Sequence, residues 1–92
     1  MYKIQIKKQA LKELNKLSTE TIDGFNGKFL ELSKDPYSVN GVKPVKNPKG
    51  LGIKFKEVYR VRVGDYRAIY AIENDILIIH ILKIAHRKEV YE

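Results

Sequence analysis

The sequence contains no cysteine among its 92 residues. A disulfide-stabilised scaffold and a thiolate metal site are therefore excluded. The same absence is typical of proteins in the reducing cytosol, so we expect a cytoplasmic protein. There are only two histidines and no HExxH motif, which makes a zinc site improbable, and we expect no metal or other cofactor.

Long apolar runs and nucleotide-binding motifs are also missing. The longest apolar run, ILIIHIL at residues 76–82, is too short to span a membrane. The first residues, MYKIQIKKQALKEL, lack the continuous apolar segment of a signal peptide. Neither GxxxxGK[ST] nor GxGxxG occurs, and none of the five serines and threonines stands in a nucleophile-elbow context.

What the sequence has in excess is positive charge. The net charge is +7, from 18 lysines and arginines against 11 acidic residues. Residues 35–62 alone hold seven basic residues and two acidic ones. A localised positive field of this kind favours a polyanion, most often nucleic acid. Since many small proteins are simply rich in lysine, an ordinary solvated surface is the alternative.

The first third of the chain predicts a strand followed by two helices. Apolar and polar residues alternate through residues 2–7, which is the pattern of a half-buried strand. Apolar residues then recur at helical spacing through residues 8–17 and 19–35. Ser18 or Thr19 is expected to cap the second helix.

Two glycines weaken the second predicted helix. Gly24 and Gly27 each cost about 1 kcal/mol relative to alanine. Their spacing puts them on nearly one side of the helix. Two explanations are open: a neighbouring element approaches closely here, or the helix begins irregularly.

The rest of the chain predicts a loop and then a sheet. Residues 35–52 hold all three prolines and are expected to form a solvated loop. Strand-like runs with tight turns between them follow at residues 53–63, 66–72 and 76–84. The last run is apolar on both faces, so we expect an interior strand covered on both sides over most of its length. The fold class is therefore α+β: one domain over residues 1–92, with a βαα opening and an antiparallel β-meander.

Three arginines surround the predicted hairpin YRVRVGDYRAIYAI. Arg60 and Arg62 are two residues apart and should project from one face, with Arg67 on the partner strand within reach of Arg62. A solvated outer face, with the positive charges relieved by Asp65 and Glu73, is one explanation. Phosphate recognition is the other, because guanidinium groups bind phosphate oxygens bidentately and keep their charge at any working pH.

The C-terminal KIAHRKEVYE adds further candidates. His86, directly before Arg87, can exchange a proton near neutral pH, although a solvated histidine at a strand end fits equally well. Tyr91, taken alone, is an ordinary exposed residue. His80 lies inside IIHIL and is expected to be hydrogen-bonded within the sheet rather than catalytic.

Residues 59–92, YRVRVGDYRAIYAIENDILIIHILKIAHRKEVYE, resemble the C-terminal half of RelE-type toxins of the RelE/ParE toxin–antitoxin superfamily. The resemblance rests on RVGDYR, the following IY, an acidic turn, an apolar strand and the HRxEVY ending. KQALKELNKL and the second helix agree with the family's βαα opening. Nearly the whole chain is covered, with residues 35–58 the least well matched. The implied fold is RelE-like, that is, similar to microbial ribonucleases.

The resemblance implies an mRNA interferase, a metal-independent endoribonuclease that cuts messenger RNA, in RelE itself on translating ribosomes. The substrate's own 2′-hydroxyl attacks the neighbouring phosphate and leaves a 2′,3′-cyclic phosphate. This chemistry needs a base, cations for the charge on phosphorus and a proton donor for the leaving oxygen. The implied partners are a cognate antitoxin, the ribosome and mRNA, with no membrane.

The resemblance also assigns roles to individual residues. Arg67, in GDYR, matches the phosphate-binding arginine, and Arg87 matches a later arginine of the same cluster. Tyr91 matches the C-terminal tyrosine that stacks on a base. His86 falls where relatives carry a histidine before an arginine, and it is the best available general acid or base.

The remaining expected site residues are cations. Arg60 and Arg62 stand where RelE has two lysines, and as arginines they supply charge but are poor proton acceptors. Together with Lys54 and Lys56 they are the expected RNA-binding residues.

Two other functions share this resemblance. A ParE-type toxin has the same fold but acts on DNA gyrase, and the ending with His86, Arg87 and Tyr91 argues for the RelE side. A non-catalytic or decayed family member is the second alternative.

Overall fold

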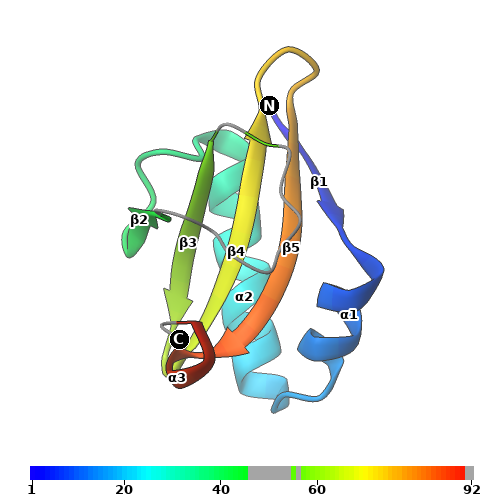
Figure 1. Cartoon of the computed structure of the whole chain (residues 1–92), viewed down its shortest axis with the longest axis vertical. Coiled ribbons are helices and arrows are strands. Elements are labelled where there is room, and N and C mark those ends of the chain that lie inside the picture. Colours follow the sequence, from blue (N-terminus) through cyan, green and yellow to red (C-terminus); the bar gives the residue numbers. More distant parts are fainter. Residues whose placement is uncertain (46–54, 56, 91–92) are drawn as a thin grey trace.

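The computed structural model describes residues 1–45, 55 and 57–90 of the chain. In this part of the chain the strands form one five-stranded sheet in the order β1-β5-β4-β3-β2 (Figure 1). The elements, in chain order, are β1 (Lys3–Ile6), α1 (Lys8–Asn15), α2 (Thr19–Lys34), β2 (Val42–Pro44), β3 (Val58–Val63), β4 (Tyr66–Glu73), β5 (Ile78–His86) and α3 (Arg87–Val90). The predicted α+β class with a βαα opening is confirmed.

The middle of the sheet is the predicted meander. Strands β3, β4 and β5 pair antiparallel in succession. The two outer strands were not predicted to pair in this way: β1 runs parallel to β5, and β2 pairs antiparallel with β3. Pairing with β5 makes the N-terminal strand one edge of the sheet.

The prediction of a loop over residues 35–52 is wrong for Val42–Pro44, which form β2 at the other edge of the sheet. This strand is only three residues long and ends in proline, which lacks the N–H needed inside a sheet but is tolerated in an edge strand. Residues 46–52 lie outside the described part of the chain.

One face of the sheet is covered by α2, which passes behind the strands in Figure 1. The main hydrophobic core lies between them and includes Phe25 and Phe29 of α2 and Val61, Tyr70 and Ile81 of the sheet. The opposite face carries a smaller cluster of Val58, Ile69 and Ala71. Burial is therefore strongest on the helix side, as the alternation of the strands predicts.

The helix α2 begins as predicted. The Ser18 side chain accepts a hydrogen bond from the backbone N–H of Thr21 at 3.2 Å, so Ser18 is the N-cap. The helix runs without interruption through Gly24 and Gly27, which excludes an irregular beginning. A Cβ atom at Gly24 would lie 2.8 Å from Val63 Cγ1, so close approach of β3 accounts for this glycine. Nothing lies within 4 Å of the corresponding point at Gly27, and the structure does not explain that glycine.

The strands β3 and β5 begin later than predicted, and β5 also runs two residues further, to His86. β3 begins at Val58 rather than residue 53, although residues 53, 54 and 56 of that run are outside the described chain. β5 begins at Ile78, because Leu77 before it has a φ of 53° and belongs to the exposed turn.

The strand β5 is interior, as predicted, since it lies between β1 and β4. Its coverage on both faces was overestimated. Ile79 and Ile81 are buried against the helices, whereas His80 and Leu82 between and after them are half-buried. The short helix α3 was not predicted. No helix in the described ranges is long and apolar enough to cross a membrane.

Candidate nucleic-acid interface

The three arginines of the hairpin lie on the sheet face away from α2. Val61 on β3 is fully buried in the main core, so Arg60 and Arg62 on either side of it project from the opposite face. Arg62 lies directly across from Arg67 on β4. Side chains at such opposed positions share a face, with Cβ atoms about 5 Å apart. The predicted proximity of Arg67 and Arg62 is therefore confirmed.

Arg67 is not an ordinary solvated cation. Only 8% of its surface is exposed, whereas Arg62 is exposed. Arginine is rarely this buried in proteins. A solvated outer face therefore accounts for Arg62 but not for Arg67. Glu73, one of the acidic residues expected to relieve the arginines, is hydrogen-bonded to His80 instead.

His80 has the structural role that was predicted. Its Nε2 atom is hydrogen-bonded to Glu73, and its ring stacks on Phe55 with the centroids 4.8 Å apart. This pair is part of the sheet face that carries the smaller hydrophobic cluster. His80 shares the face of the arginines but does not line their pocket, so we assign it no part in the candidate site.

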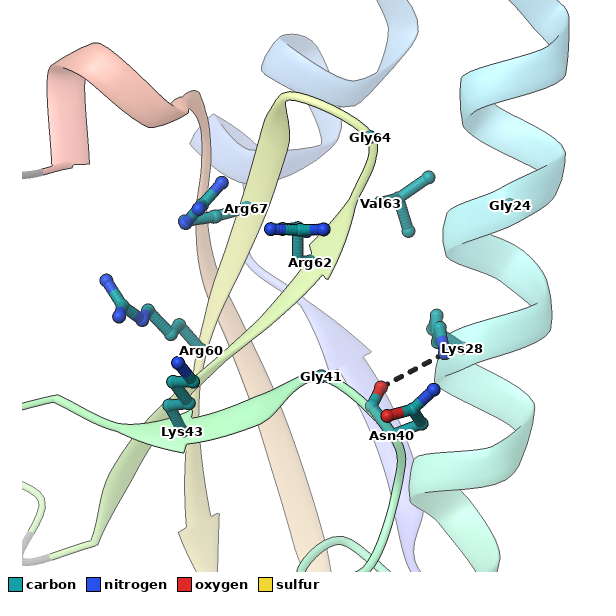
Figure 2. A pocket seen from close by; sticks show the side chains of 10 residues that line it. All are labelled: Gly24, Lys28, Asn40, Gly41, Lys43, Arg60, Arg62, Val63, Gly64 and Arg67. Carbon is teal, nitrogen blue, oxygen red and sulfur yellow. Dashed lines mark hydrogen bonds between the residues drawn. The ribbon is translucent and has the colours of Figure 1, made fainter.

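A pocket of about 460 Å³ joins the arginines to α2 and to the turn before β2 (Figure 2). Most of its cationic side chains come from the sheet. The glycines in its lining have no side chain that would fill the pocket. The lining residues are Gly24, Lys28, Asn40, Gly41, Lys43, Arg60, Arg62, Val63, Gly64 and Arg67. All charged side chains among these described lining residues are basic, which creates a positive field that favours an anionic ligand.

Lys43 and Lys28 are pocket residues that the sequence did not identify. Lys43, on β2, lies directly across from Arg60 on β3. It was counted in the basic segment, but only the unpredicted pairing of β2 with β3 brings it to the arginines. Lys28 comes from α2, and its Nζ donates a hydrogen bond to the Asn40 carbonyl at 3.1 Å. In the sequence, only the basic excess of residues 35–62 pointed to Lys43 as a site residue, and no feature of the sequence pointed to Lys28.

The turn that leads into β2 requires a glycine. Gly41 has a φ of 90°, in the left-handed region that side chains disfavour. A Cβ atom there would lie 3.9 Å from the backbone N and O atoms of Arg62, so the turn packs directly on β3. This contact and the Lys28 hydrogen bond fix the position of β2 beside the arginines.

Arg87 lies at the same end of the sheet as the Gly64 turn. Its backbone N–H donates to the Asp65 carbonyl at 2.7 Å, which fixes the start of α3 to the turn between β3 and β4. Figure 1 shows α3 in front of this end of the sheet, with α2 behind it. The Arg87 side chain is exposed. The structure thus brings Arg87 near the end of the arginine-bearing face, although it does not line the pocket.

His86 lies at that end too, but on the other face. It is directly across from Tyr66, whereas Arg67 is across from Ala85. Neighbouring residues of a strand project to opposite faces, so the His86 side chain shares the face of Tyr66, which packs on the main core. The two rings meet edge to face with centroids 5.4 Å apart.

The hydrogen bonding of His86 defines its tautomer. Its Nδ1 atom accepts from the backbone N–H of Lys88 at 3.3 Å, so the proton of the neutral ring is on Nε2. Of the other predicted site residues, Tyr91, Lys54 and Lys56 lie outside the described part of the chain.

Known proteins share both the sequence and the fold of this chain. Residues 4–91 match the family model described as the ParE toxin of the type II toxin–antitoxin system parDE. A protein of Methanocaldococcus jannaschii named as toxin RelE1 is 32% identical over 91 residues, which cover 99% of this chain and 96% of that protein.

Solved structures agree. The structure of the archaeal RelE–RelB complex from Pyrococcus horikoshii contains a chain with a TM-score of 0.78 and 30% identity, covering 94% of each chain. The isolated RelE toxin of E. coli has a TM-score of 0.69 at 18% identity, covering 94% of this chain and 84% of that one, which supports the fold alone. The resemblance noted in the sequence is confirmed, and the chain belongs to the RelE/ParE superfamily of type II toxin–antitoxin toxins.

Proposed function

We propose that this toxin is an mRNA interferase that cuts messenger RNA on the ribosome, in the cytoplasm, by attack of the 2′-hydroxyl on the adjacent phosphate. The observation that carries the proposal is the nearly buried Arg67 directly opposite Arg62, at the wall of a pocket whose charged lining residues are all basic. A gyrase inhibitor has no evident need for such a phosphate-binding arrangement.

The arginines supply charge stabilisation in this reaction. As the 2′-oxygen attacks, negative charge builds up on the phosphate oxygens, and guanidinium groups fixed in advance stabilise it. Arg67 is the principal group because its burial restricts its position and excludes water. Arg60, Arg62 and Arg87 add positive charge along the RNA, and as arginines they are poor proton acceptors.

Proton transfer and base positioning belong to the C-terminal residues in this proposal. His86 is the candidate for proton transfer through Nε2, since its Nδ1 is engaged by the Lys88 amide. Because His86 projects from the face opposite Arg67, it would act across the end of the sheet. Tyr91 is the candidate for stacking on a base, and Lys54 and Lys56 for further backbone contacts.

The proposed protein partner is a cognate antitoxin. The related Pyrococcus horikoshii toxin was crystallised in complex with RelB. A net charge of +7 on this chain suits an antitoxin with an acidic segment as well as ribosomal RNA. Copurification with the product of the adjacent gene would test this partner.

The test of the function is cleavage of mRNA in a reconstituted translation system, read by primer extension. The wild type should produce cuts at ribosome-aligned positions. Arg67→Ala should reduce the rate of cutting by at least about 100-fold, as loss of one charge-stabilising group commonly does. Lys12→Ala, which removes an exposed charge from α1, is the matched control and should cut normally. A folded Arg67→Ala protein with full activity would refute the site.

Inhibition of DNA gyrase is the second candidate, because the matching family model is described by the ParE toxin. A supercoiling assay with purified gyrase separates the two functions. Gyrase inhibition without mRNA cleavage would replace the proposed function. Absence of both activities, and of growth arrest on expression, would indicate a non-catalytic member.

A further inference from the structure

We propose that the pocket contains a second phosphate subsite, formed by Lys43 and Arg60, which binds the phosphate adjacent to the one held by Arg62 and Arg67. This inference rests on the proposed function, because it takes an RNA strand as the ligand. It adds a ligand-binding role for Lys43, on the edge strand β2, and a positioning role for Lys28.

The cations of the open face form two pairs. Arg62 and Arg67 are directly opposed across β3 and β4. Arg60 and Lys43 are directly opposed across β3 and β2. Directly opposed side chains share a face, and Arg60 and Arg62 share theirs, so all four project the same way. Figure 2 shows Arg62 and Arg67 towards the Gly64 turn and Arg60 beside Lys43 below them.

The separation of the two pairs suits consecutive phosphates. Arg60 and Arg62 are two residues apart on β3, about 6.7 Å along the strand, and the two pairs lie on opposite sides of β3, about 4.8 Å apart across the sheet, so the centres of the pairs are about 8 Å apart. Successive phosphates of a single RNA strand in an extended conformation are separated by a comparable length. A strand that follows β3 can therefore place one phosphate at each pair without bending sharply.

The edge strand that carries Lys43 is held by specific contacts. Lys28 Nζ donates to the Asn40 carbonyl at 3.1 Å, which ties α2 to the turn before β2. The left-handed Gly41 packs that turn against the backbone of Arg62. Val42, Lys43 and Pro44 then pair with β3. Lys43 is consequently fixed at its backbone while its side chain stays exposed, as a contact to solvated phosphate requires.

The test compares short 2′-O-methyl RNA oligonucleotides with hydroxyl ends, which cannot be cleaved by 2′-hydroxyl attack. A dinucleotide has one phosphodiester and a trinucleotide has two. Binding is measured by NMR titration at low salt, with wild type, Lys43→Ala, Lys43→Arg and Arg67→Ala. Lys12→Ala is the control for loss of one positive charge elsewhere.

Lys43→Ala should weaken trinucleotide binding about threefold to tenfold and leave dinucleotide binding unchanged. Lys43→Arg should restore trinucleotide affinity. Lys28→Ala, which frees the turn before β2, should give the Lys43→Ala pattern in weaker form. Equal effects of Lys43→Ala on both oligonucleotides, or none on either, would overturn the second subsite.

The same titrations separate this inference from the proposed function. Arg67→Ala should weaken both oligonucleotides, because both need the first phosphate site. If Arg67→Ala weakens both but Lys43→Ala changes neither, the second subsite alone is wrong. If Arg67→Ala changes neither binding nor mRNA cleavage, the phosphate site at Arg62 and Arg67 is wrong, and the proposed function is wrong with it.

Discussion

The contact between Gly24 of α2 and Val63 of β3 allows a stability effect to be worked out from the structure. Both residues line the pocket, so this contact sets how closely the helix wall approaches the arginine-bearing hairpin. The perturbation is Gly24→Ala, with Gly27→Ala as the matched control one turn further along the same helix.

Two opposing contributions decide the outcome. Alanine in place of glycine inside a helix stabilises it by about 1 kcal/mol. At Gly27 this gain should appear in full, because nothing lies within 4 Å of the new Cβ atom. At Gly24 the new atom would lie 2.8 Å from Val63 Cγ1, well inside the optimal separation of roughly 3.5–4.0 Å between carbon atoms. Overpacking of this kind costs about 1–3 kcal/mol.

The expected values follow from these contributions. Gly27→Ala should raise the free energy of unfolding by about 1 kcal/mol, a rise in Tm of roughly 4–8 °C for a domain of this size. Gly24→Ala should leave the free energy of unfolding unchanged or lower it by up to about 2 kcal/mol. The measurement is equilibrium unfolding in urea, with the slope of the transition checked for constancy.

A third variant identifies the cause. In the Val63→Ala background the methyl group that meets the new Cβ is gone, so Gly24→Ala should recover the gain seen at Gly27. The double-mutant cycle then gives a coupling energy between the two positions. If Gly24→Ala stabilises the wild type as much as Gly27→Ala does, the close approach of α2 and β3 is wrong.

Three further predictions concern the tail and the core. His86→Gln should slow mRNA cleavage by about 100-fold, and an unchanged rate in the folded variant would remove His86 from the reaction. Tyr91→Ala should weaken cleavage in the same assay while leaving antitoxin affinity, measured by calorimetry, nearly unchanged. Burial raises the pKa of Tyr70, whose hydroxyl donates to the Pro36 carbonyl at 2.7 Å, so an unfolded chain loses this proton near pH 10 while the folded protein retains it. Stability should therefore fall above about pH 10, and Tyr70→Phe should reduce that fall in urea unfolding while costing about 1 kcal/mol at neutral pH.

The sequence predicted the elements whose patterns are local. The two helices follow from apolar residues at helical spacing. The hairpin of β3 and β4 follows from period-2 alternation on both sides of a Gly-Asp turn. The same alternation was sufficient to put Arg60 and Arg62 on one face and to bring Arg67 to them. These side chains were predicted because a hairpin fixes its own register.

The pocket wall formed by β2 could not be predicted in the same way. A three-residue strand ending in proline has no periodicity to detect, and its partner β3 begins fourteen positions further along the chain. Its pairing depends on contacts between distant segments, namely the Lys28 hydrogen bond to the Asn40 carbonyl and the packing of Gly41 on β3. Lys43 was therefore visible as charge but not as a neighbour of Arg60.

The face of His86 depends on an irregularity in β5. Tyr70 pairs with Ile81, but Ile69 pairs with Lys83, so Leu82 is an extra residue in the strand. Continued without that residue, the register would put His86 across from Asp65, on the face of Arg67. The extra residue moves it across from Tyr66, since a shift of one residue exchanges the two faces of a strand.

The sequence does carry a trace of this shift. The buried positions of β5 that belong to the main core are Ile79, Ile81 and Ile84, so the interval changes from two residues to three. A run that is apolar on both faces conceals the change, because Leu82 also packs, on the smaller cluster of the other face. The bulge thus separates the two parts of the proposed reaction: the phosphate is held on one face by Arg67, and a proton can reach His86 only around the end of the sheet. The effect of His86→Gln on the rate of mRNA cleavage is for this reason the measurement that decides whether the tail takes part in the chemistry.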